Sequence, residues 1–356
     1  MHIEELKINK FRCYKEAFAC FSPGINIIIG ENATGKTSLV EAVFFACAAK
    51  SNRTSIDKEA IMFDNEAFFI ETKVKKQSRV EKIKLSVDQN SKKITINGKT
   101  INQLSDFVGR YSVVFFGPDD LEIIKGGPFE RRKFLDISIS QNDNDYLKAL
   151  IRYKKLLKAR NDLLKQENKD LDLLEIYESE IIESGKTIIT KRESFIKTIN
   201  PYFQNKENVI SGKLDVGKVV YKPSTNVENY EDNFKKSFRK DEITQNTNIG
   251  PHRDDFCVLI NGSDCSFYGS QGQKKTVCVA LKFALGEYLI SKGKEIIIIL
   301  DDVFSELDEI RQNQMMSLLE KGNQIFITTT SINLIDKEIL GKSKIIKVEK
   351  GGVLNG

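Results

Sequence analysis

Eight residues near the amino terminus have the types and the spacing of a phosphate-binding loop. They are Gly30, Glu31, Asn32, Ala33, Thr34, Gly35, Lys36 and Thr37. Glycines let the backbone turn its N–H groups inward around a phosphate, and the helix start adds positive potential. In this pattern the lysine reaches the β- and γ-phosphates, and the threonine hydroxyl ligates Mg²⁺. The loop therefore predicts a site for ATP and Mg²⁺, with Lys36 acting on the phosphates.

The residues on either side of the loop predict the strand, loop and helix that such a site requires. An apolar run, residues 25–29, precedes the loop, and a helical pattern, residues 38–45, follows it. Two glycines alone are also compatible with an ordinary turn between a strand and a helix. With both flanks in place, a phosphate-binding loop is the better interpretation.

Two acidic residues later in the chain are candidates for the other half of this site. Asp301 and Asp302 follow five apolar residues, 296–300, which predict a central parallel strand. Open α/β sheets bind ligands at the carboxyl ends of their strands. We expect Asp301 to hold Mg²⁺, directly or through water, and Asp302 to act as the general base that orients the attacking water.

A third candidate is the segment around Ser270. Small and polar residues, 269–276, stand in front of a helical pattern over residues 277–289. A helix start exposes unpaired N–H donors and is a second anion-binding end. One chain cannot easily direct two such ends at one γ-phosphate, so we expect a dimer in which the second end comes from the other copy.

Composition excludes several other classes of protein. A net charge of +5 and a pI near 8.6 are too weak to indicate nucleic-acid binding by themselves. Two histidines exclude a His-rich metal site, and six scattered cysteines are typical of reduced thiols. The amino terminus carries acids where a signal peptide is apolar, and no stretch reaches the roughly 18 apolar residues of a membrane span. We expect a cytoplasmic protein.

The order of the expected elements predicts the architecture. Alternating patterns over residues 3–21 and 67–101 predict antiparallel strands, with a hairpin at Asn97 and Gly98. Residues 131–200 contain almost no Gly or Pro and have apolar residues three and four apart, which predicts two long antiparallel helices. Strands and helices alternate again near the carboxyl end. The predicted strands there are residues 296–300, 324–328 and 345–348, and the predicted helix is 309–321.

At 356 residues the chain exceeds what one core usually holds, so a second domain or a large insertion is expected. We expect one α/β ATPase domain assembled from both chain ends, residues 1–118 and 242–356. A mainly helical insertion, residues 119–241, would interrupt it.

These motifs together resemble the ABC-type (P-loop) head ATPases of DNA repair, and within them the RecF family of bacterial recombination mediators. The phosphate-binding loop, a short S-x-G-Q signature and the acidic segment 301–308 carry the resemblance. Three stretches are more specific to the family, namely residues 116–121, 125–132 and 250–255. The matches cover nearly the whole chain, from Ile3 to Val348. The resemblance implies an ABC-type head with an antiparallel β layer and an inserted helical lid.

The family implies an ATP-dependent homodimer that binds double-stranded or gapped DNA and hydrolyses ATP slowly. It implies RecO- and RecR-type partners, and roles in recombinational repair, replication restart and the SOS response to DNA damage. It also implies site residues. They are Walker A residues 30–37, Walker B Asp301, catalytic Asp302, a signature acting in trans (Ser270, Gly272 and Gln273), a D-loop (Ser305 to Asp308) and Arg12, which approaches the phosphates.

Four positions depart from the usual family pattern. Ala33 stands where the loop usually has Gly, and Lys275 replaces an Arg, which removes bidentate phosphate recognition. Asp302 stands where many ABC ATPases have Glu, and Thr330 is at the switch position that usually carries His. We therefore expect nucleotide-gated dimerisation rather than fast hydrolysis.

A basic stretch in the expected insertion is a candidate DNA surface. The candidates are Arg131, Arg132, Lys148, Arg152 and Lys155. A solvated helix face is the ordinary meaning of such charges, and only the family resemblance favours contact with DNA phosphates.

Two other functions remain open from the sequence. An ABC transporter subunit would need a coupling surface for a membrane partner, and residues 250–255 have no place in it. An SMC- or Rad50-like structural head would need arms of hundreds of residues, whereas this insertion has roughly a hundred.

Overall fold

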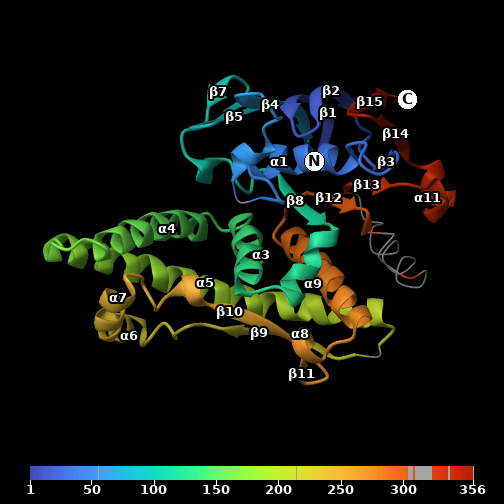
Figure 1. The fold of residues 1–356 in the computed structure, drawn as a ribbon. Helices are drawn as coiled ribbons and strands as arrows, with labels where there is room; N and C mark the ends of the chain where they lie inside the picture. The colour runs from blue at the N-terminus through green and yellow to red at the C-terminus, as the bar shows by residue number, and fades with distance from the viewer. Residues whose placement is uncertain (55, 214, 304–307, 309–322, 336, 356) are drawn as a thin grey trace. The chain divides into compact units, whose positions relative to one another are not determined.

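The computed structural model describes residues 1–54, 56–213, 215–303, 308, 323–335 and 337–355 (Figure 1). The chain divides into two compact units. Met1–Asp120 and Leu285–Gly356 form the first, which we call the head unit, and Leu121–Ala284 form the second, the insertion unit. Within the described residues, no helix combines the length and the apolarity needed to span a bilayer.

The head unit contains a sheet in which strands from both ends of the chain alternate. Its order is β15-β14-β3-β13-β12-β8, and all neighbours are parallel except β14 and β15. All residues of β8, β12 and β13 are buried, which confirms the central parallel strands. The strands are β3 (Ile25–Ile29), β8 (Ser112–Phe116), β12 (Ile296–Asp301), β13 (Gln324–Thr329), β14 (Lys344–Glu349) and β15 (Gly352–Asn355).

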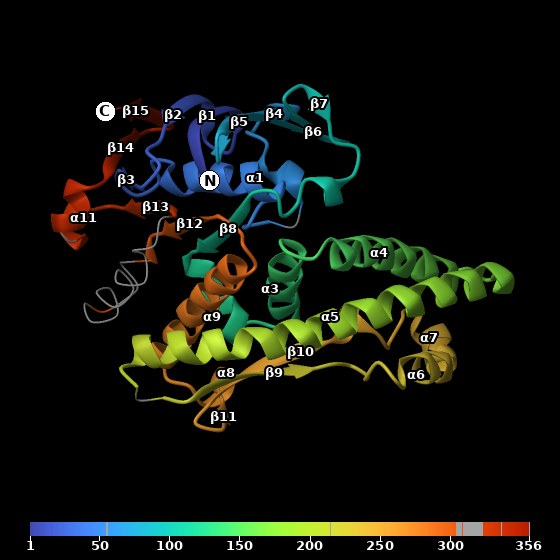
Figure 2. The same ribbon diagram turned by 180° about the vertical axis from the view of Figure 1, so that it is seen from behind.

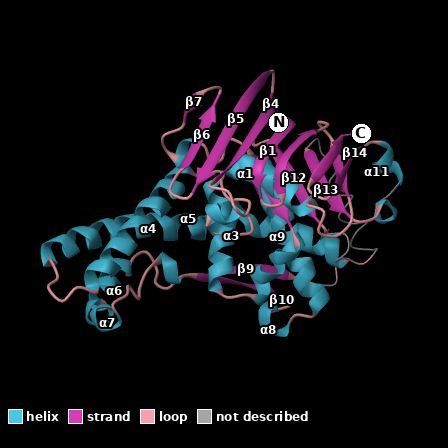
Figure 3. Cartoon of the chain, turned by 45° about the horizontal axis from the view of Figure 1, so that its top comes forward, coloured by secondary structure: helices cyan, strands magenta, loops and turns pink. Residues whose placement is uncertain are grey.

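A second, antiparallel sheet confirms the predicted β layer. Its order is β2-β1-β4-β5-β6-β7, and Asn97 and Gly98 make the β6–β7 turn, both with positive φ as in a type I′ turn. Figure 3 shows both sheets in magenta. The strands are β1 (His2–Phe11), β2 (Tyr14–Cys20), β4 (Ala67–Lys76), β5 (Arg79–Asp88), β6 (Lys92–Ile96) and β7 (Lys99–Thr100).

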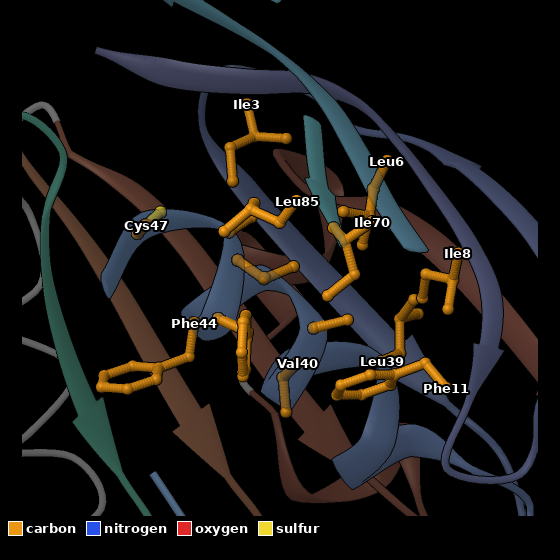
Figure 4. Packing of buried hydrophobic residues seen from close by; sticks show 14 of the residues in the cluster. Ile3, Leu6, Ile8, Phe11, Leu39, Val40, Phe44, Cys47, Ile70 and Leu85 are labelled. Carbon is orange, nitrogen blue, oxygen red and sulfur yellow. The ribbon is translucent and has the colours of Figure 1, made fainter. Parts of the chain in front are cut away.

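Helix α1 (Lys36–Ala48) packs its apolar side chains against the inner face of this antiparallel sheet (Figure 4). The rings of Phe11, Phe45 and Phe68 meet edge to face, with centroids 5.0 to 6.3 Å apart. Burying side chains of this size contributes about 1.5–3 kcal/mol each, so this core fixes where α1 begins.

Short elements connect the strands of the head unit. They are η1 (Asp57–Ala60), η2 (Leu104–Asp106), η3 (Pro118–Leu121), η6 (Ile332–Leu334) and α11 (Lys337–Gly341). The predicted helix over residues 309–321 lies outside the described residues.

Two long antiparallel helices dominate the insertion unit, as predicted (Figure 2). Asp143, at the start of α4, pairs with Lys191 in the middle of α5 at 2.6 Å, and Arg160, near the end of α4, pairs with Glu178, near the start of α5, at 2.7 Å. The two helices therefore run in opposite directions. The helices are α2 (Glu122–Lys125), α3 (Pro128–Ser140), α4 (Asn144–Leu164), α5 (Leu171–Ser211), α6 (Tyr230–Lys236), α7 (Phe238–Thr244) and α8 (Cys265–Tyr268). The long helix α9 (Gln271–Ser291) begins in this unit and ends in the head unit.

The predicted helical block ends at residue 200, and this bound was wrong, because α5 continues through Pro201 to Ser211. Proline removes one backbone donor and usually breaks a helix. Beside this proline the Asn200 side chain makes additional bonds, since its Nδ2 donates to the carbonyl oxygens of Ile196 (3.0 Å) and Val219 (2.8 Å). Its Oδ1 accepts from the N–H of Val219 at 2.8 Å, which ties the helix to strand β9.

A small antiparallel sheet, β11-β10-β9, completes the insertion unit, together with η4 (Pro251–Arg253). Its strands are β9 (Gly217–Lys222), β10 (Asp255–Ile260) and β11 (Ser263–Asp264). Because β10 pairs with β9 along its whole length, residues 242–284 pack with the insertion unit, although the sequence placed them with the head. The predicted division into an ATPase head and a helical insertion, at residues 118/119 and 241/242, stays a prediction.

The family-specific stretch 250–255 anchors a buried polar network inside this unit. The Arg192 guanidinium donates to Asp254 Oδ2 (3.0 Å), to Asp136 Oδ1 (2.8 Å) and to the Pro251 carbonyl (2.6 Å). Tyr221 also donates to the fully buried Asp254. Burial acts to raise the pKa of Asp136. The positive charges of Arg192 and Lys154 outweigh this effect and hold the pKa below its ordinary value.

His252 has a structural role in the same network. Its Nε2–H donates to the carbonyl of Thr247 at 2.9 Å, so its Nδ1 accepts from the Tyr153 hydroxyl at 2.6 Å. Burial lowers the pKa of His252 to about 4, and the ring is therefore neutral at neutral pH.

Replacing Arg192 by Met should lower the free energy of unfolding by about 3–5 kcal/mol, because Asp254 and Asp136 would remain buried without their cation. Arg152→Met is the matched control. Arg152 is half-exposed and pairs with Glu180 and Glu183, so its loss should lower the free energy of unfolding much less than the loss of Arg192. Urea unfolding of both variants measures the difference, and equal small losses would contradict a stabilising role for the network.

Candidate nucleotide site

The phosphate-binding loop joins β3 to α1. Glycine is required at two positions of the loop, for a different structural reason at each. A Cβ at Gly30 would lie 2.3 Å from the carbonyl oxygen of Val348 on β14, so only glycine fits there. Gly35 has φ +113°, a conformation that other residues rarely adopt. Ala33 also has positive φ, at +62°, and so carries strain at the position where the family pattern has Gly. The N–H of Gly351, in the turn between β14 and β15, donates to the carbonyl of Thr34 at 3.0 Å and so attaches the loop to this turn.

Lys36 lies inside this loop with its ammonium almost fully withdrawn from solvent. Its Nζ donates to the carbonyl oxygens of Gly30 and Glu31, both at 2.8 Å. Burial lowers the pKa of Lys36, while the charges of Asp302 and Asp301 act in the opposite direction. A desolvated cation within a loop of backbone donors is an arrangement that an anionic phosphate stabilises.

Asp301 is the last residue of β12, and strand register places it next to the loop. It stands opposite Thr328 on β13, which pairs in turn with β3. Asp301 Oδ1 accepts from the hydroxyls of Thr37 (3.0 Å) and Thr328 (2.7 Å). Burial raises the pKa of Asp301, so a neighbouring cation would stabilise its charged form. One buried carboxylate beside a hydroxyl is a donor set that suits Mg²⁺ shared with a phosphate.

Asp302 adopts a left-handed conformation, with φ +53°. Its N–H donates to the Thr328 hydroxyl at 2.9 Å, so one threonine holds both acids of the pair. Non-glycine residues in this region are uncommon and concentrate at functional sites. Thr330, the residue at the predicted switch position, follows β13 directly and is exposed.

Arg12 has a partner that the sequence did not indicate. Its guanidinium makes a bidentate pair with Glu41 of α1, at 2.6 and 3.0 Å, and donates to the Glu59 carbonyl at 2.8 Å. Glu41 is fully buried and also accepts from the Ser51 hydroxyl at 2.6 Å. Contact between Arg12 and a phosphate stays a prediction.

Sequence reasoning missed Glu41 and also Arg53, which lies 3.6 Å from the Glu41 carboxylate. The positive charge of Arg53 acts to lower the pKa of Asp301, so this arginine lies near the acidic pair. A signal was present, because Glu41 is the one charged residue in the apolar run 39–47 of the Walker A helix.

The predicted signature forms the start of α9 in the insertion unit. Ser270 Oγ accepts from the Gln273 N–H at 3.1 Å, and Gln273 Oε1 accepts from the Ser270 N–H at 2.9 Å, which is a capping box. The Gln273 amide also donates to Asp215 at 3.0 Å. Ser270 is exposed, and its hydroxyl proton is not needed for the cap. Gly272 lies in the first turn of α9.

The remaining predicted residues are those of the D-loop and the DNA contacts. Ser305 lies outside the described residues, whereas Asp308 is described and exposed. Arg131 makes a bidentate pair with Asp255 at 2.6 and 3.0 Å, and Arg132 donates to the Asp254 carbonyl at 2.9 Å. These two predicted DNA contacts thus have partners within the insertion unit.

The other three predicted DNA contacts lie on the exposed face of α4. Arg152 pairs with Glu180 and Glu183. Lys148 and Lys155 are exposed, and neither makes an ion pair with another residue in the described part of the chain.

Comparison with known proteins assigns the chain to a family. The family model of the RecF/RecN/SMC N terminal domain matches residues 2–352. A DNA replication and repair protein RecF from Lachnoclostridium phytofermentans is 38% identical over 362 residues, which cover 100% of both chains. One from Bacillus cytotoxicus is 36% identical over 366 residues, covering 99% of this chain and 98% of the relative.

Solved structures agree with this assignment. A structure of the recombination mediator protein RecF with ATP, in the RecFOR pathway, is 34% identical with a TM-score of 0.91, covering 99% of this chain and 97% of that one. An Smc head domain from Pyrococcus furiosus shares the fold at 19% identity and a TM-score of 0.55, over 99% of this chain and 95% of that one. By these matches along its whole length, the chain belongs to the RecF family of DNA replication and repair proteins.

Proposed function

We propose that the chain is an ATP-gated DNA clamp of recombinational repair. Two copies bind Mg-ATP between the phosphate-binding loop of one copy and the Ser270 helix end of the other, and the closed dimer holds double-stranded or gapped DNA. The observation that carries this proposal is that one chain has both a phosphate-binding loop closed around Lys36 and an exposed, capped helix start at Ser270. The RecF structure solved with ATP supports the choice of nucleotide.

Each residue has a defined task in this proposal. Lys36 binds the β- and γ-phosphates, Thr37 and Asp301 hold Mg²⁺, and Asp302 accepts a proton from the attacking water. When bound, Mg²⁺ supplies stabilisation of the negative charge on the phosphates. The Ser270 hydroxyl donates to the γ-phosphate of the partner's nucleotide while its oxygen keeps the helix cap. Because Asp302 is shorter than the usual Glu and constrained by Thr328, hydrolysis is slow and releases the clamp.

The proposed partners follow from the family. The RecFOR pathway named for the solved relative supports partners of the RecO and RecR types, in a cytoplasmic repair process. A structural head of the SMC or Rad50 kind is less favoured, since α5, with 41 residues, is long enough for only about 60 Å of arm. A transporter subunit is not supported by any of the similar proteins above.

Asp302→Asn should bind ATP and accumulate as a stable dimer, because the proton acceptor is lost and the nucleotide is not cleaved. Lys36→Ala is the control that should neither bind ATP nor dimerise. Analytical ultracentrifugation with and without ATP measures both. A wild type and an Asp302→Asn variant that remain equally monomeric with ATP would rule out the dimer mechanism.

Ser270→Arg should retain ATP binding but remain monomeric, because a bulky cation replaces the hydroxyl donor. Ser270→Asp separates this effect from folding, since Asp is an equally good helix cap whose carboxylate repels a triphosphate. Both variants should bind a fluorescent ATP analogue as tightly as the wild type does. Normal dimerisation of Ser270→Asp would show that this helix end does not meet the nucleotide.

DNA affinity should depend on both ATP and salt. Replacing Lys148 and Lys155 by Ala should reduce the slope of log affinity against log salt by about 2, one unit for each lost phosphate contact. Arg152→Ala should change the slope less, because Arg152 is neutralised by two glutamates. The measurement is a titration of gapped duplex DNA across salt concentrations, with and without ATP. Affinity that is independent of ATP and of salt would remove the clamp.

A further inference from the structure

Three aromatic side chains are far more exposed to solvent than the other described Phe and Tyr side chains. Phe63 in the head unit exposes 94% of its surface, and Phe267 and Tyr268 in the insertion unit expose 80% each. The next most exposed Phe or Tyr among the described residues is Phe129, at 58%. Single exposed apolar residues are common on protein surfaces, so the position of these three is the informative observation.

Phe63 belongs to a segment that packs on the turn next to the phosphate-binding loop. The Met62 N–H donates to the carbonyl of Lys10 at 2.9 Å, which fixes the 61–64 segment against the β1–β2 turn. That turn contacts the loop, because a Cβ at Gly35 would lie 3.0 Å from Cys13 Sγ and 2.8 Å from the Tyr14 hydroxyl. The segment that contains Phe63 is therefore joined to the nucleotide half-site of the head unit through this turn.

Phe267 and Tyr268 lie beside the other half-site. They end helix α8, two residues before Ser270, and their ring centroids are 6.4 Å apart. The Gly269 N–H donates to the Cys265 carbonyl at 3.1 Å, and a Cβ at Gly269 would lie 2.6 Å from that oxygen. This tight turn fixes the two rings relative to the start of α9.

We propose that Phe63 of one copy packs against Phe267 and Tyr268 of the second copy when the dimer closes on ATP. The inference rests on the proposed function, because only there do the Lys36 loop and the Ser270 helix end of different copies meet. When they meet, the aromatic residues next to each half-site approach one another. A two-fold axis repeats the contact, so each dimer contains two of these aromatic contacts.

Aromatic side chains suit this task energetically. They bury large areas at low conformational cost, ring pairs attract one another beyond the effect of the buried area, and aromatic residues dominate interface hot spots. In the open monomer the same rings remain in water. The contact thus favours closure without contributing to nucleotide affinity of the single copy.

The test compares Phe63→Ser with the double variant Phe267→Ser/Tyr268→Ser, each in wild type and in Asp302→Asn. Both should bind ATP normally as monomers, and the dimer dissociation constant with ATP should rise at least about tenfold. Val80→Ser and Ile243→Ser are matched controls that should leave the constant unchanged, since both residues are exposed apolar side chains. Val80 pairs with Lys75 at the His2 end of the antiparallel sheet, and Ile243 is on α7.

Mixing the two variants tests whether the contact joins different copies. In a mixed dimer, the Phe63→Ser copy supplies intact Phe267 and Tyr268, and the other copy supplies intact Phe63, so one of the two contacts is restored. The mixture should therefore dimerise more tightly than either variant alone. No gain on mixing would overturn the inference, as would variants that dimerise normally but lose DNA affinity, which would indicate base stacking.

These outcomes separate the inference from the proposed function. If Asp302→Asn dimerises with ATP and the aromatic variants dimerise equally well, the aromatic contact is wrong and the clamp stands. If Asp302→Asn itself stays monomeric with ATP, both proposals are wrong.

Discussion

A single carboxylate oxygen joins the two ends of this chain. Asp301 Oδ1 accepts hydrogen bonds from Thr37 and Thr328. The three residues come from three different segments, and 264 residues separate Thr37 from Asp301 in sequence. The hydrogen bonds exist only if β3, β13 and β12 pair in the correct register, because a shift by one residue turns every side chain to the other face. The phosphate loop, the acidic pair and the parallel sheet therefore depend on one another. The apolar core beneath α1 holds this arrangement, since it fixes the helix start at Lys36.

In the insertion unit, by contrast, buried charge defines the packing. Arg192 and Arg160 are almost fully withdrawn from solvent and pair with Asp254, Asp136 and Asp241. Such pairs are expensive to bury and are stable only when every donor and acceptor is matched. The stretch 250–255, which the sequence marks as specific to the family, supplies several of these partners. Its role visible in the structure is to hold helices and strands together, and several basic residues of the unit serve the same end rather than facing solvent.

Local patterns predicted most of the elements, because they depend on local chemistry. The type I′ turn at Asn97 and Gly98, the buried strand before Asp301 and the helix after Ser270 all have signals within a few residues. What the local patterns did not predict depends on non-local contacts. Nothing near Pro201 indicates that the Asn200 amide will bind Val219 or that α5 will continue to Ser211. Likewise, the pairing of β10 with β9 is invisible in either strand alone, and the partnership of Arg12 with Glu41 requires the folded head.

The position of β3 has a consequence for synthesis on the ribosome. This strand is made within the first 30 residues, yet both its sheet neighbours, β13 and β14, are made after residue 323. The phosphate loop has the same dependence, since Gly351 contacts Thr34. The apolar strand β3 therefore has no sheet partner until nearly the whole polypeptide has emerged. Long-range parallel pairing is also intrinsically slow. The insertion unit is one continuous segment, Leu121–Ala284, and is free to form first, so a nascent chain stalled before β13 would contain an ordered insertion and no nucleotide pocket.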